Sequence, residues 1–334
     1  MKKLISLFVP LMALFLTLAP QRMWADEPNF FTITNNHAST ATSVSMQRNN
    51  SSNSPKPTMY YRIFNSAGEQ TSPASGWSSK QITGTSAVSL GSVPAGGKMQ
   101  IYGTIAITTG SSTNIYYNKF VISGGTPVVS GNILSLTDYD ETNEEIKTKD
   151  IWPNYYFAQL FDGCSALVSA EDLEMPATEL GQYTCNKMFN SCSGLISPPK
   201  VLPATTISNN CYYGMFWSCA KLEKSPAIYA TNVTTSGRYN MFNGCKALKT
   251  IRVNHTDWTG TPVPSNPFKQ WVTSVPTSGT GLKFYCPPTL PRTINANDNI
   301  PSSSWTIYSY NITLQMTGEV HGRMVQVPTS ILLG

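Results

Sequence analysis

The chain has 334 residues, of which 12% are charged and 40% are hydrophobic, against about 25% and 45–50% in an average soluble domain. That length suggests about two domains, and the low charge density argues against highly charged disorder. Three of the 23 basic residues lie in the first 25 positions, which leaves the rest of the chain close to neutral. A near-neutral chain does not suggest a nucleic-acid partner.

The first 25 residues have the pattern of a secretory signal peptide. Lys2 and Lys3 precede an uncharged apolar run over 4–19, and Ala25 supplies a small residue before the expected cut. The run is interrupted by Pro10 and is shorter than the ~20 residues that a membrane-spanning helix needs. We therefore expect the mature chain, 26–334, to be exported to the cell surface or medium and to contain no membrane span, with the periplasm as the alternative location.

Residues 26–145 contain short segments that predict a β-sandwich. Residues 99–107 keep a polar–apolar period of two, which is typical of a half-buried strand. Further strands are expected at 30–34, 43–46, 59–64, 115–122 and 128–136, with Ser, Asn, Pro and Gly stretches between them. This pattern favours an immunoglobulin-like antiparallel sandwich. The acidic stretch 138–145 is expected to be a linker. The alternative is a Ca²⁺ site that lacks the usual Asp-x-Asp-x-Asp-Gly loop.

Residues 146–260 contain four copies of the motif Phe-x-x-Cys-x-x-Leu, whose cysteines are 28, 27 and 26 residues apart. Within a copy, apolar residues at i, i+3, i+4 and i+7 predict one face of a two-turn helix, followed by a short strand. Arg238 takes the first of these positions in the last copy, so the stripe of apolar side chains is interrupted there. Stacked copies would bury these faces together. The expected repeat core is Phe161, Cys164, Leu167, Met188, Phe189, Cys192, Leu195, Met215, Phe216, Cys219, Leu222, Met241, Phe242, Cys245 and Leu248.

The predicted fold class is therefore α+β: an N-terminal antiparallel β-sandwich followed by a short leucine-rich-repeat solenoid. The solenoid is expected to have about four coils, each with one short helix and one short strand. The expected boundaries are 1–25 for the signal peptide, 26–145 for the sandwich, 146–260 for the repeats, 261–312 for a C-terminal β cap and 313–334 for a tail.

The repeat motif resembles a known family. Met-Phe-x-x-Cys-x-x-Leu, with Leu-Pro-Ala-Thr-Thr at 202–206 and Cys-Tyr-x-x-Met-Phe at 211–216, is similar to the BspA-type leucine-rich repeats of surface and secreted proteins of Bacteroidetes. The resemblance covers about residues 155–253 and is weaker at 284–308. It implies a location in the cell envelope and, in some members, adhesion to host proteins or other bacteria. The chain lacks the cysteine at the cleavage site that lipid-anchored members carry.

The seven cysteines leave three alternatives open. The intervals between Cys164, Cys192, Cys219 and Cys245 are the repeat period, and the chain contains no Cys-x-x-Cys pair, so a metal site is the least favoured alternative and we expect none. We expect no cofactor either. Buried thiols that fill a core are favoured. A disulfide between stacked copies, such as one joining Cys185 and Cys211, is the alternative in an exported protein.

The sequence offers only weak catalytic candidates. His255 near Asp257 suggests a base with an orienting carboxylate, but we expect a solvent-exposed loop histidine there. Ser197 and Lys200 match Ser-x-x-Lys, yet prolines fill the middle of the motif, where it requires a helical turn. We therefore expect no catalytic residues and a protein that is not an enzyme.

Two expected surfaces supply the candidate binding residues. Solenoids bind through their strand face, where we place Ser169, Ser197, Glu223, Lys224, Lys249 and Thr250. Rigid aromatic side chains are favoured anchors, and the candidates are Tyr213 and Trp217, expected to point outward, and Trp258, in the loop after the repeats. Packing against the caps is the favoured interpretation of these aromatic residues, and binding is the other. The favoured function is binding of a host or bacterial surface protein through the repeats. The alternative is glycan binding through the aromatic side chains, as an accessory to polysaccharide uptake.

Overall fold

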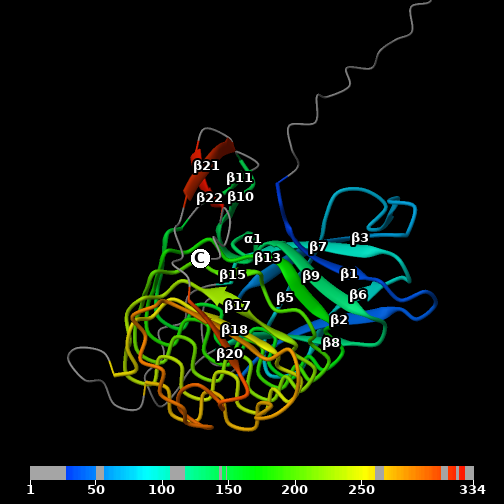
Figure 1. Cartoon of the computed structure of the whole chain (residues 1–334). Helices are drawn as coiled ribbons and strands as arrows, with labels where there is room; N and C mark the ends of the chain where they lie inside the picture. The colour runs from blue at the N-terminus through cyan, green and yellow to red at the C-terminus, as the bar shows by residue number, and fades with distance from the viewer. Residues whose placement is uncertain are drawn as a thin grey trace, which may run out of the picture.

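The computed structural model describes residues 28–49, 56–105, 117–142, 145–147, 149–259, 267–309, 315–320 and 323–327 (Figure 1). The expected signal peptide lies outside these residues. Strand makes up 35% and helix 2% of the structure, and the only helix among the described residues is α1 (Ser135–Asp138). The expected α+β fold with a helix in every coil is therefore wrong: the structure consists almost entirely of strands and turns.

Two sheets form the N-terminal part. In the larger sheet the strand order is β13-β9-β1-β7-β3-β4, and β5 also pairs with β3. The smaller sheet has the order β6-β2-β8. Their bounds are β1 (Phe31–Asn35), β2 (Thr42–Arg48), β3 (Thr58–Phe64), β4 (Gln70–Ser72), β5 (Ser78–Gln81), β6 (Val88–Val93), β7 (Lys98–Gly103), β8 (Asn118–Ser123), β9 (Pro127–Asn132) and β13 (Ser169–Glu174).

Alternating burial explains how the two sheets pack. Strands β1 and β3 bury every second residue, as expected for sheets with one apolar face. The rings of Phe31 in β1 and Phe120 in β8 stack with centroids 5.3 Å apart. The large sheet is not purely antiparallel, because β13 pairs parallel with β9. The expected self-contained antiparallel sandwich is corrected in this respect: a strand from the repeat region completes its sheet.

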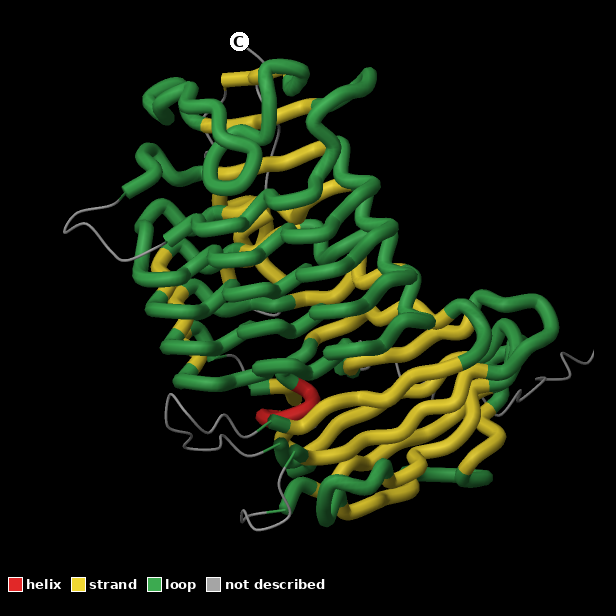
Figure 2. The backbone as a smooth tube through the Cα atoms, turned by 90° about the horizontal axis from the view of Figure 1, so that it is seen from below, coloured by secondary structure: helices red, strands yellow, loops and turns green. Residues whose placement is uncertain are grey.

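The rest of the chain forms coils that stack on the N-terminal sheets (Figure 2). The coils contribute short strands to two all-parallel sheets, with orders β12-β14-β16 and β15-β17-β18-β19-β20. Their bounds are β12 (Ile151–Trp152), β14 (Glu179–Leu180), β15 (Val201–Leu202), β16 (Thr206–Ile207), β17 (Lys224–Ile228), β18 (Thr250–Val253), β19 (Lys283–Cys286) and β20 (Thr306–Ser309). Two hairpins complete the described chain: β10 (Tyr139–Asp140) with β11 (Glu145–Ile146), and β21 (Gln315–Val320) with β22 (Arg323–Val327).

The segments that were expected to be helices are ladders of turns. In the second copy the amide of Asn186 donates to the carbonyl oxygen of Tyr183 at 3.2 Å, within the same coil. The next amide, of Lys187, donates to Tyr213 in the following coil at 2.8 Å, and this alternation continues to Cys192. Half of the amides are therefore used between coils, whereas an α-helix would use them within one segment.

A left-handed residue at every fourth position makes this alternation possible. In the second copy the φ angles of Tyr183, Lys187 and Ser191 are 58°, 53° and 57°. Such angles are uncommon outside glycine and cost about 1–2 kcal/mol each. Only cooperative bonding between copies and burial of their inner faces offsets that cost. One copy alone would therefore not hold this conformation.

A continuous row of aromatic rings runs through the core. The N-terminal sheets start this row, because Phe120 in β8 takes the place that a preceding coil would occupy and its amide donates to Leu160 at 2.8 Å. Each phenylalanine of the repeat motif then stacks on the next. The centroid distances are 5.6 Å for Phe120–Phe161, 5.1 Å for Phe161–Phe189, 5.4 Å for Phe189–Phe216, 5.7 Å for Phe216–Phe242 and 5.8 Å for Phe242–Trp271.

The motif cysteines form a second row beside the rings. The thiol of each one donates to the carbonyl oxygen of the phenylalanine one coil earlier, as Cys192 does to Phe161 and Cys219 does to Phe189, both at 3.0 Å. Cys164 donates in the same way to Phe120, at 3.3 Å. All seven cysteines are free and buried. The thiols therefore connect successive coils without covalent bonds.

We expect these thiols to be unreactive in the native protein. Burial raises the pKa of Cys164 and of Cys211 to about 12 and holds the pKa of Cys192 well above its usual range, so the reactive thiolate is scarce at neutral pH. A colorimetric thiol reagent should react slowly with folded protein at pH 8 and should titrate seven thiols in guanidinium. Fewer than seven in non-reducing denaturant would reveal a disulfide and contradict this expectation.

Candidate functional site

The parallel strands of the coils present one continuous outer face. In β18 the side chains of Ile251 and Val253 are buried, whereas those of Thr250 and Arg252 lie on the outside. The strand register places the outer residues in columns. One column contains Lys224, Thr250, Lys283 and Thr306, and the bridge between Ser169 and Ser197 lies on the same side of earlier coils. Below, "strand face" means the outer side of β13, β15 and β17–β20.

The neighbouring column of the strand face is aromatic and cationic. It contains Arg252, Tyr285 and Tyr308, which are register partners on β18, β19 and β20. The guanidinium of Arg252 lies 5.2 Å from the centroid of the Tyr285 ring, and this ring stacks on Tyr308 at 4.9 Å. These three side chains thus support one another across the strands. The sequence interpretation missed them, although the alternation within Thr250–Val253 and Lys283–Cys286 could have indicated outward positions.

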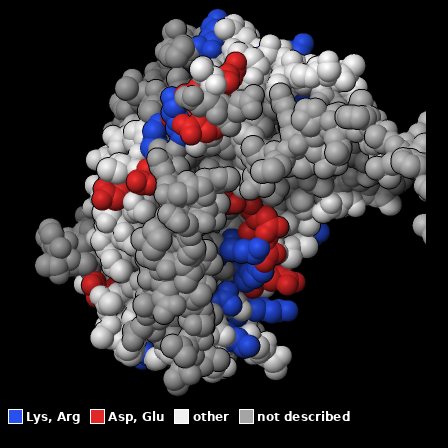
Figure 3. All heavy atoms as spheres, turned by 90° about the horizontal axis from the view of Figure 1, so that it is seen from above, with Lys and Arg blue, Asp and Glu red and all other residues white. Residues whose placement is uncertain are grey.

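Charged side chains gather on the strand face, in a chain that has few of them. Lys224 forms an ion pair with Glu171 at 2.8 Å, and Lys200 forms one with Asp172 at 2.5 Å. Figure 3 shows acidic and basic side chains side by side in one band of the surface. These pairs are partly exposed, so each contributes at most about 1 kcal/mol to stability. Their importance is therefore the pattern of charge that they present, with acidic groups on β13 and basic groups on the later coils.

Glu223 and Lys249 directly precede the strands β17 and β18 of this face. Both side chains are exposed, and the amide of Lys249 donates to the carbonyl oxygen of Glu223 at 2.8 Å. Of the six polar residues expected on the strand face, Ser169, Lys224 and Thr250 lie in its strands, and Glu223 and Lys249 directly precede β17 and β18. Ser197 lies before β15 and forms the bridge to Ser169.

The aromatic candidates do not form one platform. Tyr213 and Trp217 are half-buried on the turn side of the coils, and the ammonium of Lys187 lies 5.8 Å and 5.6 Å from their ring centroids. Tyr213 also stacks on Tyr239 at 5.0 Å. Trp258 is instead buried, 9% exposed, and its indole nitrogen donates to the carbonyl oxygen of Pro291 at 2.8 Å. Trp258 therefore belongs to the C-terminal core, in agreement with packing against the cap, and is not an exposed binding residue.

His255 is buried, which corrects the expectation of an exposed loop histidine. Its side chain is 0% exposed and is enclosed by the rings of Trp258 and Phe268, at centroid distances of 4.9 Å and 4.6 Å. Neither ring nitrogen has a hydrogen-bond partner among the described residues. Burial and the nearby positive charge of Arg238 hold the pKa of His255 well below its usual range. The imidazole is therefore neutral, and it is enclosed too completely to act as a base on an external substrate.

Arg238, which was expected to interrupt the apolar stripe of the last repeat copy, is also buried in this region. Its guanidinium donates to the carbonyl oxygens of Ala230 and Asn232, at 2.9 Å and 3.2 Å, and lies 5.3 Å from the ring centroid of Phe268. Burial lowers its pKa to about 10, so it remains charged at neutral pH. Arg238 therefore ties the fourth coil to the cap.

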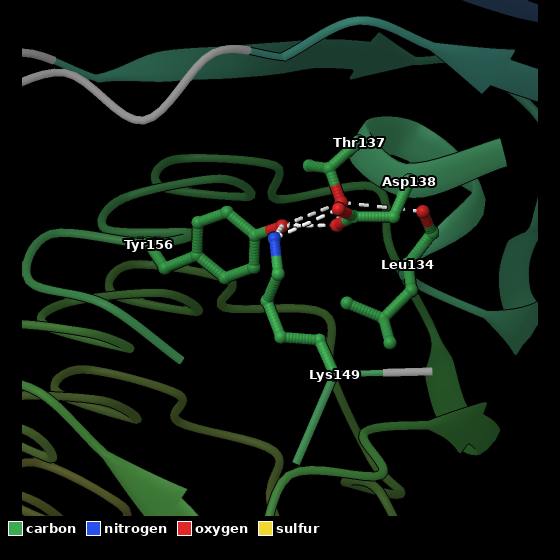
Figure 4. Close-up of polar contacts among 5 residues, drawn as sticks. All are labelled: Leu134, Thr137, Asp138, Lys149 and Tyr156. Carbon is green, nitrogen blue, oxygen red and sulfur yellow. Dashed lines mark hydrogen bonds and ion pairs between the residues drawn. The ribbon is translucent and has the colours of Figure 1, made fainter. Parts of the chain in front are cut away.

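A polar cluster joins α1 to the first coil (Figure 4). The ammonium of Lys149 contacts Asp138 at 2.7 Å and the hydroxyl of Tyr156 at 3.2 Å. The Tyr156 hydroxyl also donates to Asp138 and contacts Thr137. Burial and the hydrogen bond to Asp138 raise the pKa of Tyr156 far above its usual range, so the phenol stays protonated. The contacts connect Asp138 and Thr137 of the N-terminal part to the coils, which makes the cluster a structural joint.

The described ranges contain no group of three or more His, Cys, Asp or Glu side chains placed to hold a metal ion. No helix within those ranges is long and apolar enough to cross a membrane. Comparison with protein-family models, curated proteins and solved structures finds no match to this chain. The strand face is the candidate site because of its own register and contacts.

Proposed function

We propose that the protein is a non-catalytic binding protein, exported to the cell surface or medium, that binds a host or bacterial protein through the strand face. The observation that carries the proposal is the concentration of charged and aromatic side chains on this face of a chain that is only 12% charged. Arg and Tyr are enriched among the residues that dominate binding energy at protein interfaces. Parallel strands hold these side chains on a rigid surface, which lowers the entropy lost on binding.

The sequence supports the rest of the proposal. The basic residues and apolar run at the N-terminus favour export, and the repeat motif resembles that of BspA-type surface proteins. Glycan binding is less well supported. Sugars stack on open ring faces, whereas the Tyr213 ring stacks on Tyr239 and has the Lys187 ammonium near its centroid.

A charge exchange on the strand face tests this proposal. In the double variant Glu171→Lys with Lys224→Glu the ion pair can still form, but the charges that a partner meets are reversed. Purified protein should bind saturably to at least one protein in a panel of matrix and bacterial surface proteins, and the exchange should weaken that binding at least about tenfold. Surface plasmon resonance would measure both.

Trp217→Ala is the matched control for this experiment, because it changes the aromatic candidate on the turn side and leaves the strand face intact. Its binding of the protein partner should match that of the unaltered chain. Saturable binding of a polysaccharide that Trp217→Ala abolishes would instead favour glycan capture. The absence of protein binding, or protein binding that survives the charge exchange, would contradict the proposal.

A further inference from the structure

The charges on the strand face are unequally satisfied, and the difference indicates what kind of partner fits. At the β13 end, Glu171 and Asp172 are paired with Lys224 and Lys200. At the β18–β20 end, the ion pairs among the described residues include none of Lys249, Arg252 and Lys283. We define the basic patch as Lys249, Arg252, Lys283, Tyr285 and Tyr308. The basic patch therefore carries positive charges that form no ion pair within the described part of the chain.

The geometry of the basic patch is preorganised. Strand register fixes Arg252 beside Tyr285 and Lys283 beside Thr250, in two columns on adjacent strands. Neighbouring strands lie about 4.8 Å apart, and alternate residues along one strand lie about 6.6–6.8 Å apart. Contact with the Tyr285 ring, 5.2 Å away, restricts the Arg252 guanidinium before any partner arrives. A planar guanidinium held in this way can bind a carboxylate with two parallel hydrogen bonds.

The size of the surface limits the occupant. A stable interface buries about 800 Å² on each partner, and a patch of five side chains on three short strands is smaller than that. An extended segment that lays carboxylates across the patch fits better than a second folded domain centred on it. The exposed carboxylate of Glu223, one coil before Lys249, would repel the segment at that edge and direct it toward Lys283.

We propose that the basic patch binds an acidic, extended segment of the protein partner, with carboxylates on Arg252 and Lys283. This inference rests on the proposed function, because it names the partner chemistry for one end of the same face. The tyrosines would contact the apolar parts of the segment, and the exposed carboxylate of Glu223 would repel its acidic portion. The position of the segment on the face is thereby fixed by charge.

A labelled peptide of about 12 residues, rich in glutamate, is the probe. Fluorescence anisotropy should show saturable binding to the full protein that weakens as salt rises, because exposed charge pairs are screened. The variant Arg252→Glu with Lys283→Glu should weaken binding at least about tenfold. The matched control is Lys187→Glu with Lys269→Glu, which changes the net charge equally on the turn side and should alter the affinity less than about twofold.

A further variant separates charge from geometry. Arg252→Lys keeps the positive charge but removes the planar group that contacts Tyr285, so it should weaken peptide binding by a smaller but measurable factor. No binding by the unaltered protein, equal weakening by both double variants, or binding of heparin without binding of the peptide would overturn the inference. If a panel protein still binds in a way that depends on Glu171 and Lys224 while the peptide does not bind, the proposed function stands and this inference fails.

Discussion

Phe189→Ala should destabilise the protein by about 3–5 kcal/mol, the range measured for truncation of fully buried aromatic side chains. The Phe189 ring is 0% exposed and stacks on Phe161 and Phe216, at 5.1 Å and 5.4 Å. The cavity would interrupt the aromatic row at its middle, where coils on both sides depend on it. Because whole domains are stable by only about 5–15 kcal/mol, a large fraction of the variant should be unfolded at moderate temperature.

Equilibrium unfolding in urea, followed by circular dichroism, would measure this loss. Tyr239→Ala is the control, because it also removes a stacked aromatic ring but one that is only half-buried, on the turn side of the coils. Its cost should stay within about 1 kcal/mol. Equal costs for the two variants would mean that the aromatic row does not hold the coils together.

Acidification should destabilise the protein through His255. The folded state holds this imidazole neutral, since burial and the charge of Arg238 keep the pKa of His255 well below its usual range, whereas in the unfolded chain its pKa is near 6.5. As the pH falls, the imidazole of His255 is therefore protonated in the unfolded state at a higher pH than in the folded state. The contribution of His255 to stability is fully present above about pH 6.5 and is lost as the pH falls, by up to about 1.4 kcal/mol per pH unit.

His255→Phe removes this titration and places an apolar ring among Trp258 and Phe268. Other groups also titrate below pH 6, so the test is the difference in unfolding free energy between the variant and the unaltered chain, measured from pH 8 to pH 5. That difference should be constant above about pH 7 and should shift in favour of the variant by about 2 kcal/mol at pH 5. A difference that does not change with pH would show that His255 takes up no extra proton on unfolding.

The helices are the part of the fold that sequence reasoning predicted wrongly, and the reason is geometric. Apolar residues at i, i+3, i+4 and i+7, such as Cys185, Met188, Phe189 and Cys192, are all buried. An α-helix with 3.6 residues per turn puts these positions on one face. A ladder of turns with a left-handed residue at every fourth position does the same over eight residues. Periodicity therefore indicated which side chains face inward but not how the backbone connects them.

The misplacement of His255 has a different cause. It follows the last repeat copy in a stretch with several polar neighbours, which is typical of an exposed loop. Its burial comes from Phe268 and Trp271, which the chain brings back over it after residue 266. The local sequence around His255 does not indicate such a long-range contact.

Six N-terminal strands (β1, β2, β3, β7, β8 and β9) and the spacing of the repeat copies were determined by the sequence itself, because alternation and a recurring motif act through local geometry and side-chain burial. The strands β4, β5 and β6 were not predicted from the sequence. The tertiary structure alone decided three other features. It selected turns over helices, since half of the repeat amides find their partners in the next coil. It placed β13 in the N-terminal sheet. It also brought Arg252, Tyr285 and Tyr308 into one column, because strands far apart in sequence become neighbours only when the coils stack.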